Sequence, residues 1–260
     1  MVIAAINFTP DLGRDVDLWL FDQDKHDPLP MIACDVTVHD ARAEQLAAKL
    51  DHEGFELAPT EADIEFDAQP ERVRAIYYPA LEEQLRKRLG ARRVYAFDHD
   101  FRSSAQIVQS EHLRGAVLNA HNDYTEVSGP QRLRELLPGE ADELLKRRFA
   151  YINIWKPVGR PAEDTPLAVC DRSSLASEDF IKIHLHYPHR TGQIYGLRHS
   201  PQQRWYYYPD MRTDEVLYLK CFDSDPSQVR YTAHTAFKDP TSRPDAPARQ
   251  SIEVRTIAFF

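Results

Sequence analysis

The 260-residue chain is acidic, with 41 aspartates and glutamates against 32 lysines and arginines and a formal net charge of −9. This balance argues against nucleic acid or an anionic membrane surface as a partner, because both attract a clustered basic face. Hydrophobic residues make up 42% of the chain and charged residues 28%, which is typical of a globular protein with a sizeable core and not of a disordered segment.

Signals of cellular compartment are few. Cys34, Cys170 and Cys221 are widely spaced and form no CxxC motif, which predicts reduced thiols in a reducing compartment. The opening MVIAAINFTPDLG has no basic stretch before its apolar residues, so we expect no signal peptide. No run approaches the roughly 20 apolar residues of a membrane span. We therefore expect a cytoplasmic protein with no membrane partner.

The first ninety residues predict strands followed by helices. In chain order these are strands at 2–8 and 15–22 and helices at 39–54 and 70–90. Gly54 is the expected stop of the first helix. Pro70 lies near the start of the second helix and Gly90 at its end, with basic residues in the last turn. Pro79 is expected to kink this second helix.

Short strand-like runs dominate from residue 91 onward. They cover 92–104, 115–127, 150–158, 166–171, 180–187, 192–199, 203–210, 215–223, 229–237 and 251–260. A helical stretch at 129–149, broken at Pro138, interrupts them. Many short strands separated by turn formers predict a mainly β sandwich or barrel. We expect one domain over 1–260, with a barrel core at 91–260 and an α/β decoration at 1–90.

The segment AHNDYT contains the only His-x-Asp triplet of the chain. Residues two apart on a strand share a face, so His121 and Asp123 can reach the same point in space. An imidazole and a carboxylate suit a divalent transition metal, and a second histidine would complete a facial triad that leaves open positions. The alternative is that the triplet arises by chance and His121 is a hydrogen-bonded strand residue.

The third metal ligand is expected from a strand late in the chain. His234, in VRYTAHTAF, is the best candidate because it lies in a strand-like run with small neighbours. A core histidine is the alternative interpretation of His234. The rival candidates are His184, His186, His189 and His199. Two of these share a face in IHLHY, but no acid with similar spacing accompanies them.

The last strand-like run carries a polar face. Its members, two residues apart, are Arg249, Ser251, Glu253 and Arg255. An arginine with a hydroxyl two residues away makes a site for a carboxylate, through a charge-assisted fork and one further hydrogen bond. The alternative is that both arginines pair with acids such as Glu253 on a solvated face.

Several segments in one order resemble a known family. They are FDHDFR, AHNDYT, NIWKPVGRPAEDTPLAVCDRSSL, DEVLYLKCFDS, AHTAFKDP and APARQSIEVR. Together they resemble the CmcJ-like, gibberellin-desaturase-like hydroxylases and desaturases among the Fe(II)- and 2-oxoglutarate-dependent oxygenases, over residues 90–260. The resemblance implies a double-stranded β-helix, which is a jelly-roll, cupin-like barrel. It also implies iron(II) held by His121, Asp123 and His234.

The resemblance implies a cosubstrate site as well. The far carboxylate of 2-oxoglutarate would meet Arg249 and Ser251, with Arg255 in reserve because it shares their face. Asn153, in YINIWKP, would contact the cosubstrate or shape the pocket; a bulge or strand-end residue is the alternative. Lys156 stands where the family often has arginine, so no contact is assigned to it.

Substrate-binding candidates lie in two segments. Tyr95 and Arg102, with Asp98 and His99 in YAFDHDFR, would line the mouth of the pocket or form a structural ion pair. Trp155 would be a pocket wall or plain core.

The activity implied by the resemblance is oxidation of an unactivated C–H bond in a small specialised metabolite or an amino-acid-derived substrate. Oxygen would be the second substrate, and hydroxylation, desaturation and ring closure all stay open, as do the substrate and the oligomeric state. One alternative is another mononuclear metal enzyme, such as a zinc hydrolase or a dioxygenase without cosubstrate. It gives Arg249 and Ser251 no role. A non-catalytic binding barrel is the second alternative, and the complete ligand set speaks against it.

Overall fold

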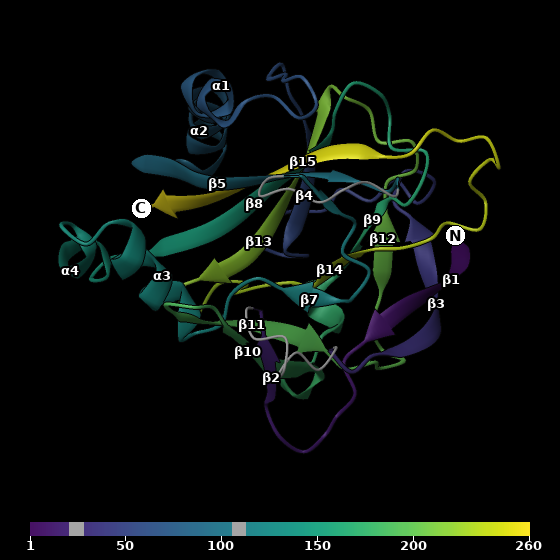
Figure 1. Cartoon of the computed structure of the whole chain (residues 1–260), viewed down its shortest axis with the longest axis horizontal. Coiled ribbons are helices and arrows are strands. Elements are labelled where there is room, and N and C mark those ends of the chain that lie inside the picture. The colour runs from purple at the N-terminus through teal and green to yellow at the C-terminus, as the bar shows by residue number, and fades with distance from the viewer. Residues whose placement is uncertain (21–28, 106–112) are drawn as a thin grey trace.

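Two curled β-sheets face each other in a computed structural model of the chain, which describes residues 1–20, 29–105 and 113–260 (Figure 1). Among these residues, nine strands form the larger sheet in the order β1-β3-β12-β9-β14-β7-β11-β10-β2. Their bounds are β1 Val2–Phe8, β2 Val16–Trp19, β3 Ile32–Asp40, β7 His121–Asn122, β9 Leu167–Cys170, β10 Phe180–His186, β11 Thr191–Leu197, β12 Trp205–Tyr207 and β14 His234–Ala236.

The described part of the second sheet has six strands in the order β4-β13-β8-β15-β5-β6. Their bounds are β4 Phe55–Pro59, β5 Arg93–Ser103, β6 Leu113–Gly115, β8 Phe149–Pro157, β13 Glu215–Asp223 and β15 Gln250–Phe259. The central strands β8, β13 and β15 are buried almost throughout, since one face meets the other sheet and the opposite face meets helices.

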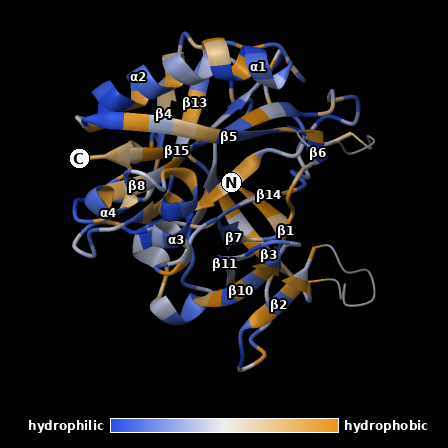
Figure 2. Ribbon diagram, turned by 60° about the vertical axis from the view of Figure 1, so that its left-hand side comes forward, coloured by the Kyte–Doolittle hydropathy of each residue, from blue (hydrophilic) through white to orange (hydrophobic). Residues whose placement is uncertain are grey.

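Helices cover the outer face of the six-stranded sheet, and hydrophilic and hydrophobic residues alternate along them (Figure 2). The predicted helix at 70–90 is confirmed as α1 Pro70–Arg72, a π-helical turn at Val73–Tyr77 and α2 Tyr78–Leu89. Pro79 has no N–H for the carbonyl four residues earlier, and the chain passes through the π turn directly before it. Gly90 ends α2 in a left-handed conformation with φ of 63°, as predicted.

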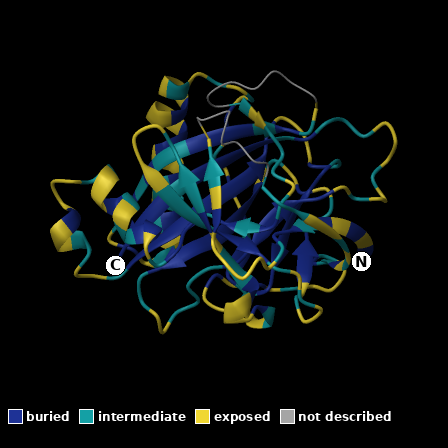
Figure 3. Ribbon diagram, turned by 60° about the horizontal axis from the view of Figure 1, so that its bottom comes forward, coloured by how far each residue is buried: buried dark blue, intermediate teal, exposed yellow. Residues whose placement is uncertain are grey.

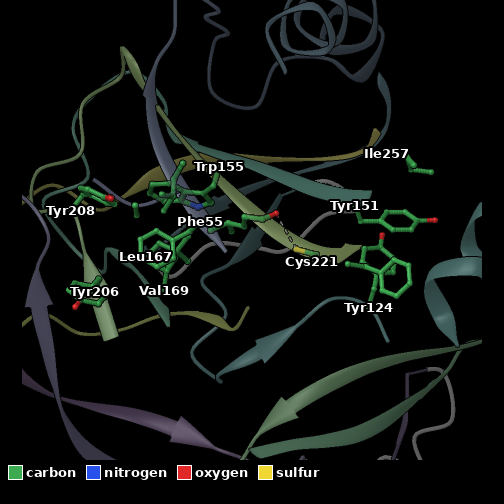
Figure 4. Packing of buried hydrophobic residues seen from close by; sticks show 14 of the residues in the cluster. Phe55, Tyr124, Tyr151, Trp155, Leu167, Val169, Tyr206, Tyr208, Cys221 and Ile257 are labelled. Atoms are coloured by element: carbon green, nitrogen blue, oxygen red, sulfur yellow. Dashed lines mark hydrogen bonds between the residues drawn. The ribbon is translucent and has the colours of Figure 1, made fainter. Parts of the chain in front are cut away.

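The buried strands lie at the centre of the molecule, whereas the helices and turns are exposed on their outer side (Figure 3). The space between the sheets is filled by an aromatic-rich cluster that includes Tyr151 and Phe55 of the six-stranded sheet and Val169 and Tyr206 of the nine-stranded sheet (Figure 4). Successive side chains of β15 point to opposite faces of the sheet. Ile257 therefore enters this cluster, whereas the next residue along the strand packs beneath the helices.

The predicted helix at 39–54 is wrong. Strand β3 runs to Asp40, whose carboxylate accepts the N–H groups of Arg42 and Ala43 at 2.9 and 3.0 Å and forms a turn. Gln45 then adopts a positive φ of 51°, which a continuing helix does not allow. Gly54 has a φ of 85° and closes a second turn, not a helix.

The first ninety residues are not a decoration, because β1, β2 and β3 belong to the nine-stranded sheet and β4 to the six-stranded one. Strands β3, β4 and β6 were not predicted. The strand expected at 15–22 is observed as β2, and residues 21–22 lie outside the described residues. The run 115–127 is extended only briefly, with β7 limited to two residues.

The other predicted elements are observed, but the runs 203–210 and 229–237 contain strands of only three residues each, β12 and β14. The stretch 129–149 forms α3 Ser128–Leu136 and α4 Ala141–Leu144, with the break at Pro138. Single 3-10 turns occupy Arg172–Ser174 and Ser177–Asp179. Within the described residues, the helices are all too short or too polar to cross a membrane.

Candidate metal centre

The structure brings together the three residues that the sequence predicts as metal ligands. His121 on β7 and His234 on β14 are direct partners in the antiparallel register of the nine-stranded sheet, and their ring centroids lie 4.5 Å apart. Asp123 follows β7 by one residue. The nitrogen and oxygen atoms that the three offer all lie within 4.8 Å of one another, which is close enough for one ion.

His121 is oriented by the backbone. Its Nδ1 lies 2.8 Å from the carbonyl oxygen of Asn119, and because a carbonyl can only accept, Nδ1 carries the proton. Nε2 is then the atom with a free lone pair, and it lies 3.5 Å from Oδ1 of Asp123. This tautomer is the one that a metal at Nε2 requires.

Asp123 is held from the opposite sheet through one oxygen. Its Oδ2 accepts hydrogen bonds from Nδ2 of Asn153 at 2.7 Å and from Nε of Arg255 at 3.3 Å. Asn153 on β8 and Arg255 on β15 are register partners, so the two donors stand side by side. The arrangement leaves Oδ1 facing the histidines.

The charge states of the group suit a cation. Burial lowers the pKa of His234 to about 4, with His121 adding to the effect, so His234 is a neutral imidazole at neutral pH. Burial alone would raise the pKa of Asp123, but His121 and Arg255 outweigh it and hold this pKa well below its usual value. Burial by itself would lower the pKa of His121, but Asp123 outweighs burial and raises this pKa. A bound metal would replace the proton that this pair favours.

Unpartnered polar atoms support the same interpretation. Nδ1 of His234 is buried without a hydrogen-bond partner among the described residues, and so is Oδ1 of Asn153. Buried polar atoms are normally paired, so a cluster of unpaired ones marks a place built for a ligand.

Arg249 and Ser251 form a second unsatisfied group. The Arg249 side chain is fully buried, its Nη1 donates to the carbonyl of Thr165 at 2.6 Å, and its Nε has no partner within the described parts of the chain. The ion pairs of the described residues include none with Arg249, and Oγ of Ser251 is also unpartnered. Burial lowers the pKa of Arg249 to about 10, which still leaves it charged at neutral pH. A buried guanidinium without an ion-pair partner among the described residues suits a carboxylate ligand, and Ser251, two residues along the chain, offers an unpartnered hydroxyl.

Arg255 is engaged differently from Arg249. Its guanidinium lies 3.0 Å from Asp98, 3.1 Å from Asp100 and 3.3 Å from Asp123. Burial opposes its charge, but these carboxylates and Glu253 raise its pKa well above the usual value. Arg255 therefore has partners from the protein itself, and it positions Asp123.

Asn153 also contacts the protein. Its Nδ2 donates to Oε1 of Glu253 at 2.8 Å in addition to Asp123, so its amide bridges two buried carboxylates. The register irregularity of β8 lies opposite Lys220 and Phe222, so Asn153 is not a bulge residue.

Two cavities meet at the group. One, of about 520 Å³, opens beside His121 and Asp123 and lies between α3, β5, β10 and β11. A narrow one reaches from His121 and His234 to Arg249 and Trp155. Arg102, Val117 and His121 line both, so a ligand in one cavity would lie next to a ligand in the other.

The predicted substrate residues have separate places. Arg102 lies where the cavities meet and donates to Asp100 at 3.2 Å and to the carbonyl of Gly115 at 3.1 Å. Trp155 is buried in the wall of the narrow cavity, and the Arg249 guanidinium lies 5.6 Å over its ring. Tyr95 is absent from the described lining of both cavities, so its role stays a prediction without a supporting contact.

The rival histidines and other candidates lie elsewhere. His184 and His186 on β10 lie 3.1 and 2.7 Å from Asp15 and Asp17 beside β2. Lys156 donates to the carbonyl of Ala62 at 2.7 Å, on the helix side of the sheet and away from the site.

Sequence reasoning missed the residues that surround the centre from a distance. Asp100, Tyr124 and four residues of α3 line the larger cavity. They come from separate elements, and no spacing along the chain marks them as neighbours of His121. Tyr124 alone had a local signal, because it directly follows Asp123.

Comparison with known proteins gives a family match over most of the chain. A family model described as "YDMC: Oxidoreductase/YMDC permease-like domain" matches residues 22–259. The Fe(II)/2-oxoglutarate-dependent dioxygenase nvfI of Aspergillus novofumigatus is 32% identical over 235 residues, which cover 86% of this chain and 82% of that relative. The hydroxylase/desaturase asaB of Aspergillus flavus is 41% identical over 137 residues, 46% of this chain.

A solved structure shows the same fold. The iron and alpha-ketoglutarate-dependent endoperoxidase NvfI superposes with a TM-score of 0.84 at 26% identity, covering 99% of this chain and 97% of that one. This likeness confirms the predicted jelly-roll barrel. Two of the curated relatives are matched over only 60% and 56% of their own length.

Proposed function

Because the chain belongs to the family of Fe(II)/2-oxoglutarate-dependent dioxygenases, we propose that it oxidises an unactivated C–H bond of a small specialised metabolite with 2-oxoglutarate and O2. The observation that carries the proposal is the convergence of His121, Asp123 and His234 at the junction of two cavities. Iron(II) with 2-oxoglutarate and O2 supplies the oxidising power for such a reaction, and the protein supplies binding and orientation.

The metal would be held by Nε2 of His121, Oδ1 of Asp123 and the imidazole of His234. Asn153 and Arg255 keep Asp123 in place through its other oxygen, which makes them positioning residues for the ligand set. Two histidines and one carboxylate leave coordination positions for a cosubstrate and for oxygen.

The cosubstrate would occupy the narrow cavity. Its far carboxylate would accept hydrogen bonds from Nε of Arg249 and Oγ of Ser251, the two unpartnered donors on the last strand. The alternative of a zinc hydrolase or of a dioxygenase without cosubstrate leaves both donors without a function. A non-catalytic barrel leaves the buried Nδ1 of His234, which has no hydrogen-bond partner among the described residues, unexplained.

The substrate would enter the larger cavity, and Arg102 would separate it from the cosubstrate. Hydroxylation, desaturation and ring closure can all begin at the same C–H bond. They differ in whether oxygen is then added at that carbon or a second hydrogen is lost, so all three stay open. We also place the protein in the cytoplasm, consistent with its three unpaired cysteines, and expect neither nucleic acid nor a membrane as partner.

Anaerobic titration of the purified protein with iron(II) and 2-oxoglutarate tests the proposal. We expect a weak visible charge-transfer band, which disappears in His121→Ala and Asp123→Ala. His184→Ala is the matched control, because it removes a histidine of the same sheet outside the site, and it should keep the band. A protein that binds zinc but never 2-oxoglutarate would contradict the proposal and favour the hydrolase.

A further inference from the structure

The larger cavity has one apolar wall. It comes from β2 and the residue after it, β10 and β11, at one end of the nine-stranded sheet. Its side chains are Leu18, Leu20, Leu185, Tyr187 and Ile194. Burying apolar surface contributes roughly 25 cal/mol per Å², so this wall favours a ligand with an apolar skeleton.

The opposite wall is charged, but its charges compensate one another. It carries three arginines and three aspartates, namely Arg102, Arg114, Arg255, Asp98, Asp100 and Asp123. Arg255 alone contacts all three carboxylates, at distances between 3.0 and 3.3 Å. Arg102 and Arg114 lie 3.2 and 3.3 Å from Asp100. This inner wall therefore offers no surplus cation to a substrate acid.

The α3 side of the cavity is different, because two arginines share one carboxylate. Arg132 of α3 and Arg190 of the β10–β11 turn lie 3.0 and 4.0 Å from the same Oε2 of Glu135. Gln131 donates to the other oxygen of Glu135 at 3.1 Å and to the carbonyl of Thr191 at 3.2 Å, which ties α3 to β11 (Figure 1). The three charged groups therefore carry a net charge of plus one.

Aromatic rings hold both guanidiniums in place. Arg190 lies 4.0 Å over the ring of Tyr187, and Arg132 lies 5.7 Å over the ring of Phe97. The two arginine side chains stay 39% and 27% exposed, so N–H groups remain open to a ligand. An arginine that is already stacked loses little freedom when it binds, which favours recognition of a planar anion.

Building on the oxygenase function proposed above, we propose that the substrate is an apolar molecule with one carboxylate, and that Arg132 and Arg190 bind this carboxylate. The fork of an arginine matches a carboxylate through two parallel hydrogen bonds. The apolar wall would hold the skeleton, which extends inward toward His121 and Asp123. The oxidised carbon therefore lies away from the acid group.

Anaerobic calorimetry on the protein loaded with iron(II) and 2-oxoglutarate tests this inference. The probes are decanoic acid and abietic acid, each compared with its primary amide, which keeps the shape and removes the charge. We expect each acid to bind about tenfold more tightly than its amide, as a charge-assisted pair provides. Arg190→Gln and Arg132→Gln should abolish this preference, and Arg134→Gln, an exposed arginine on the same helix, should keep it.

Glu135→Gln separates recognition from a structural role. It removes the competing carboxylate, so acid binding should become tighter, whereas a purely structural Glu135 would make binding weaker. The inference is overturned if neither acid binds, if acid and amide bind equally, or if both arginine variants keep the preference. The visible iron–cosubstrate band, recorded on the same samples, distinguishes the failures. If the unaltered protein gives no band, the proposed oxygenase function is wrong. If it gives the band, only the proposed preference for an acid is wrong.

Discussion

Two groups of histidine and aspartate lie in the nine-stranded sheet, and their difference explains what makes a metal site. At β7 and β14, His121, Asp123 and His234 point their ligand atoms to one place where two cavities meet, with His234 buried and the other two half-buried. At β10 and β2, His184 and His186 each take a separate aspartate on the protein surface. The residue types are the same in both groups.

The decisive differences are convergence and desolvation. Each surface histidine contacts a separate carboxylate, so the ligand atoms of these side chains do not converge on one position for an ion. The metal-site group keeps Nδ1 of His234 buried and without a hydrogen-bond partner among the described residues. The opposite sheet also supplies Asn153 and Arg255, which hold Asp123. Strand β2 is the last strand of the nine-stranded sheet as far as the structure describes it, so the surface group receives no such support from a further strand there.

The largest expected effect concerns stabilisation by iron(II). At an iron concentration about 100 times its dissociation constant, binding should stabilise the unaltered protein by about 2.7 kcal/mol, because iron binds the folded state only. Asp123→Ala should lose this gain completely, since it removes the only carboxylate ligand. Anaerobic thermal unfolding with and without iron measures it. His186→Ala should keep the full gain; an equal loss there would place the metal at the surface pair.

The next effect separates the two arginines of β15. Arg249→Ala should weaken 2-oxoglutarate binding by about 10- to 100-fold and leave iron binding unchanged, because it removes the unpaired guanidinium. Arg249→Lys should fall between, since it keeps charge and loses the fork. Anaerobic calorimetry with iron present measures both. If Arg255→Ala weakens 2-oxoglutarate binding and Arg249→Ala does not, the assignment is reversed.

A smaller effect is expected at Asn153. Asn153→Ala removes the 2.7 Å hydrogen bond to Asp123 and should lower iron affinity by about tenfold, as loss of an outer partner of a metal ligand does. Competition with a coloured chelator under anaerobic conditions gives this affinity. The control is the affinity of iron-loaded protein for 2-oxoglutarate, which should not change. A change in cosubstrate affinity alone would instead support direct contact between Asn153 and the cosubstrate.

The smallest effect belongs to the surface group. Asp17→Asn breaks the ion pair with His186, yet the free energy of unfolding should change by less than about 0.5 kcal/mol, because both side chains are in contact with solvent. Urea unfolding measures this, and iron binding should be unaffected. A loss of several kcal/mol would show that β2 depends on this pair for its attachment to β10.

Much of the fold follows from local pattern. The alternating runs at 93–103, 149–157 and 250–259 are strands, and the helix at 70–90 begins and ends near the proline and glycine that mark it. The failure at 39–54 has a local cause that periodicity does not show. The carboxylate of Asp40 accepts the N–H groups of Arg42 and Ala43, as at the start of a helix, but Gln45 adopts a left-handed conformation and ends the helical turn there.

The sequence by itself determined most of the strands and the short list of metal and carboxylate candidates, because residue type and a spacing of two decide which side chains share a face. Tertiary structure alone decided which candidates meet. Strands β7 and β14 are more than a hundred residues apart along the chain, and their pairing is set by sheet order. The same packing left Arg249 without an ion-pair partner among the described residues and surrounded Arg255 with carboxylates. The sequence could not predict this difference, because both residues are arginines on the same face of one extended segment.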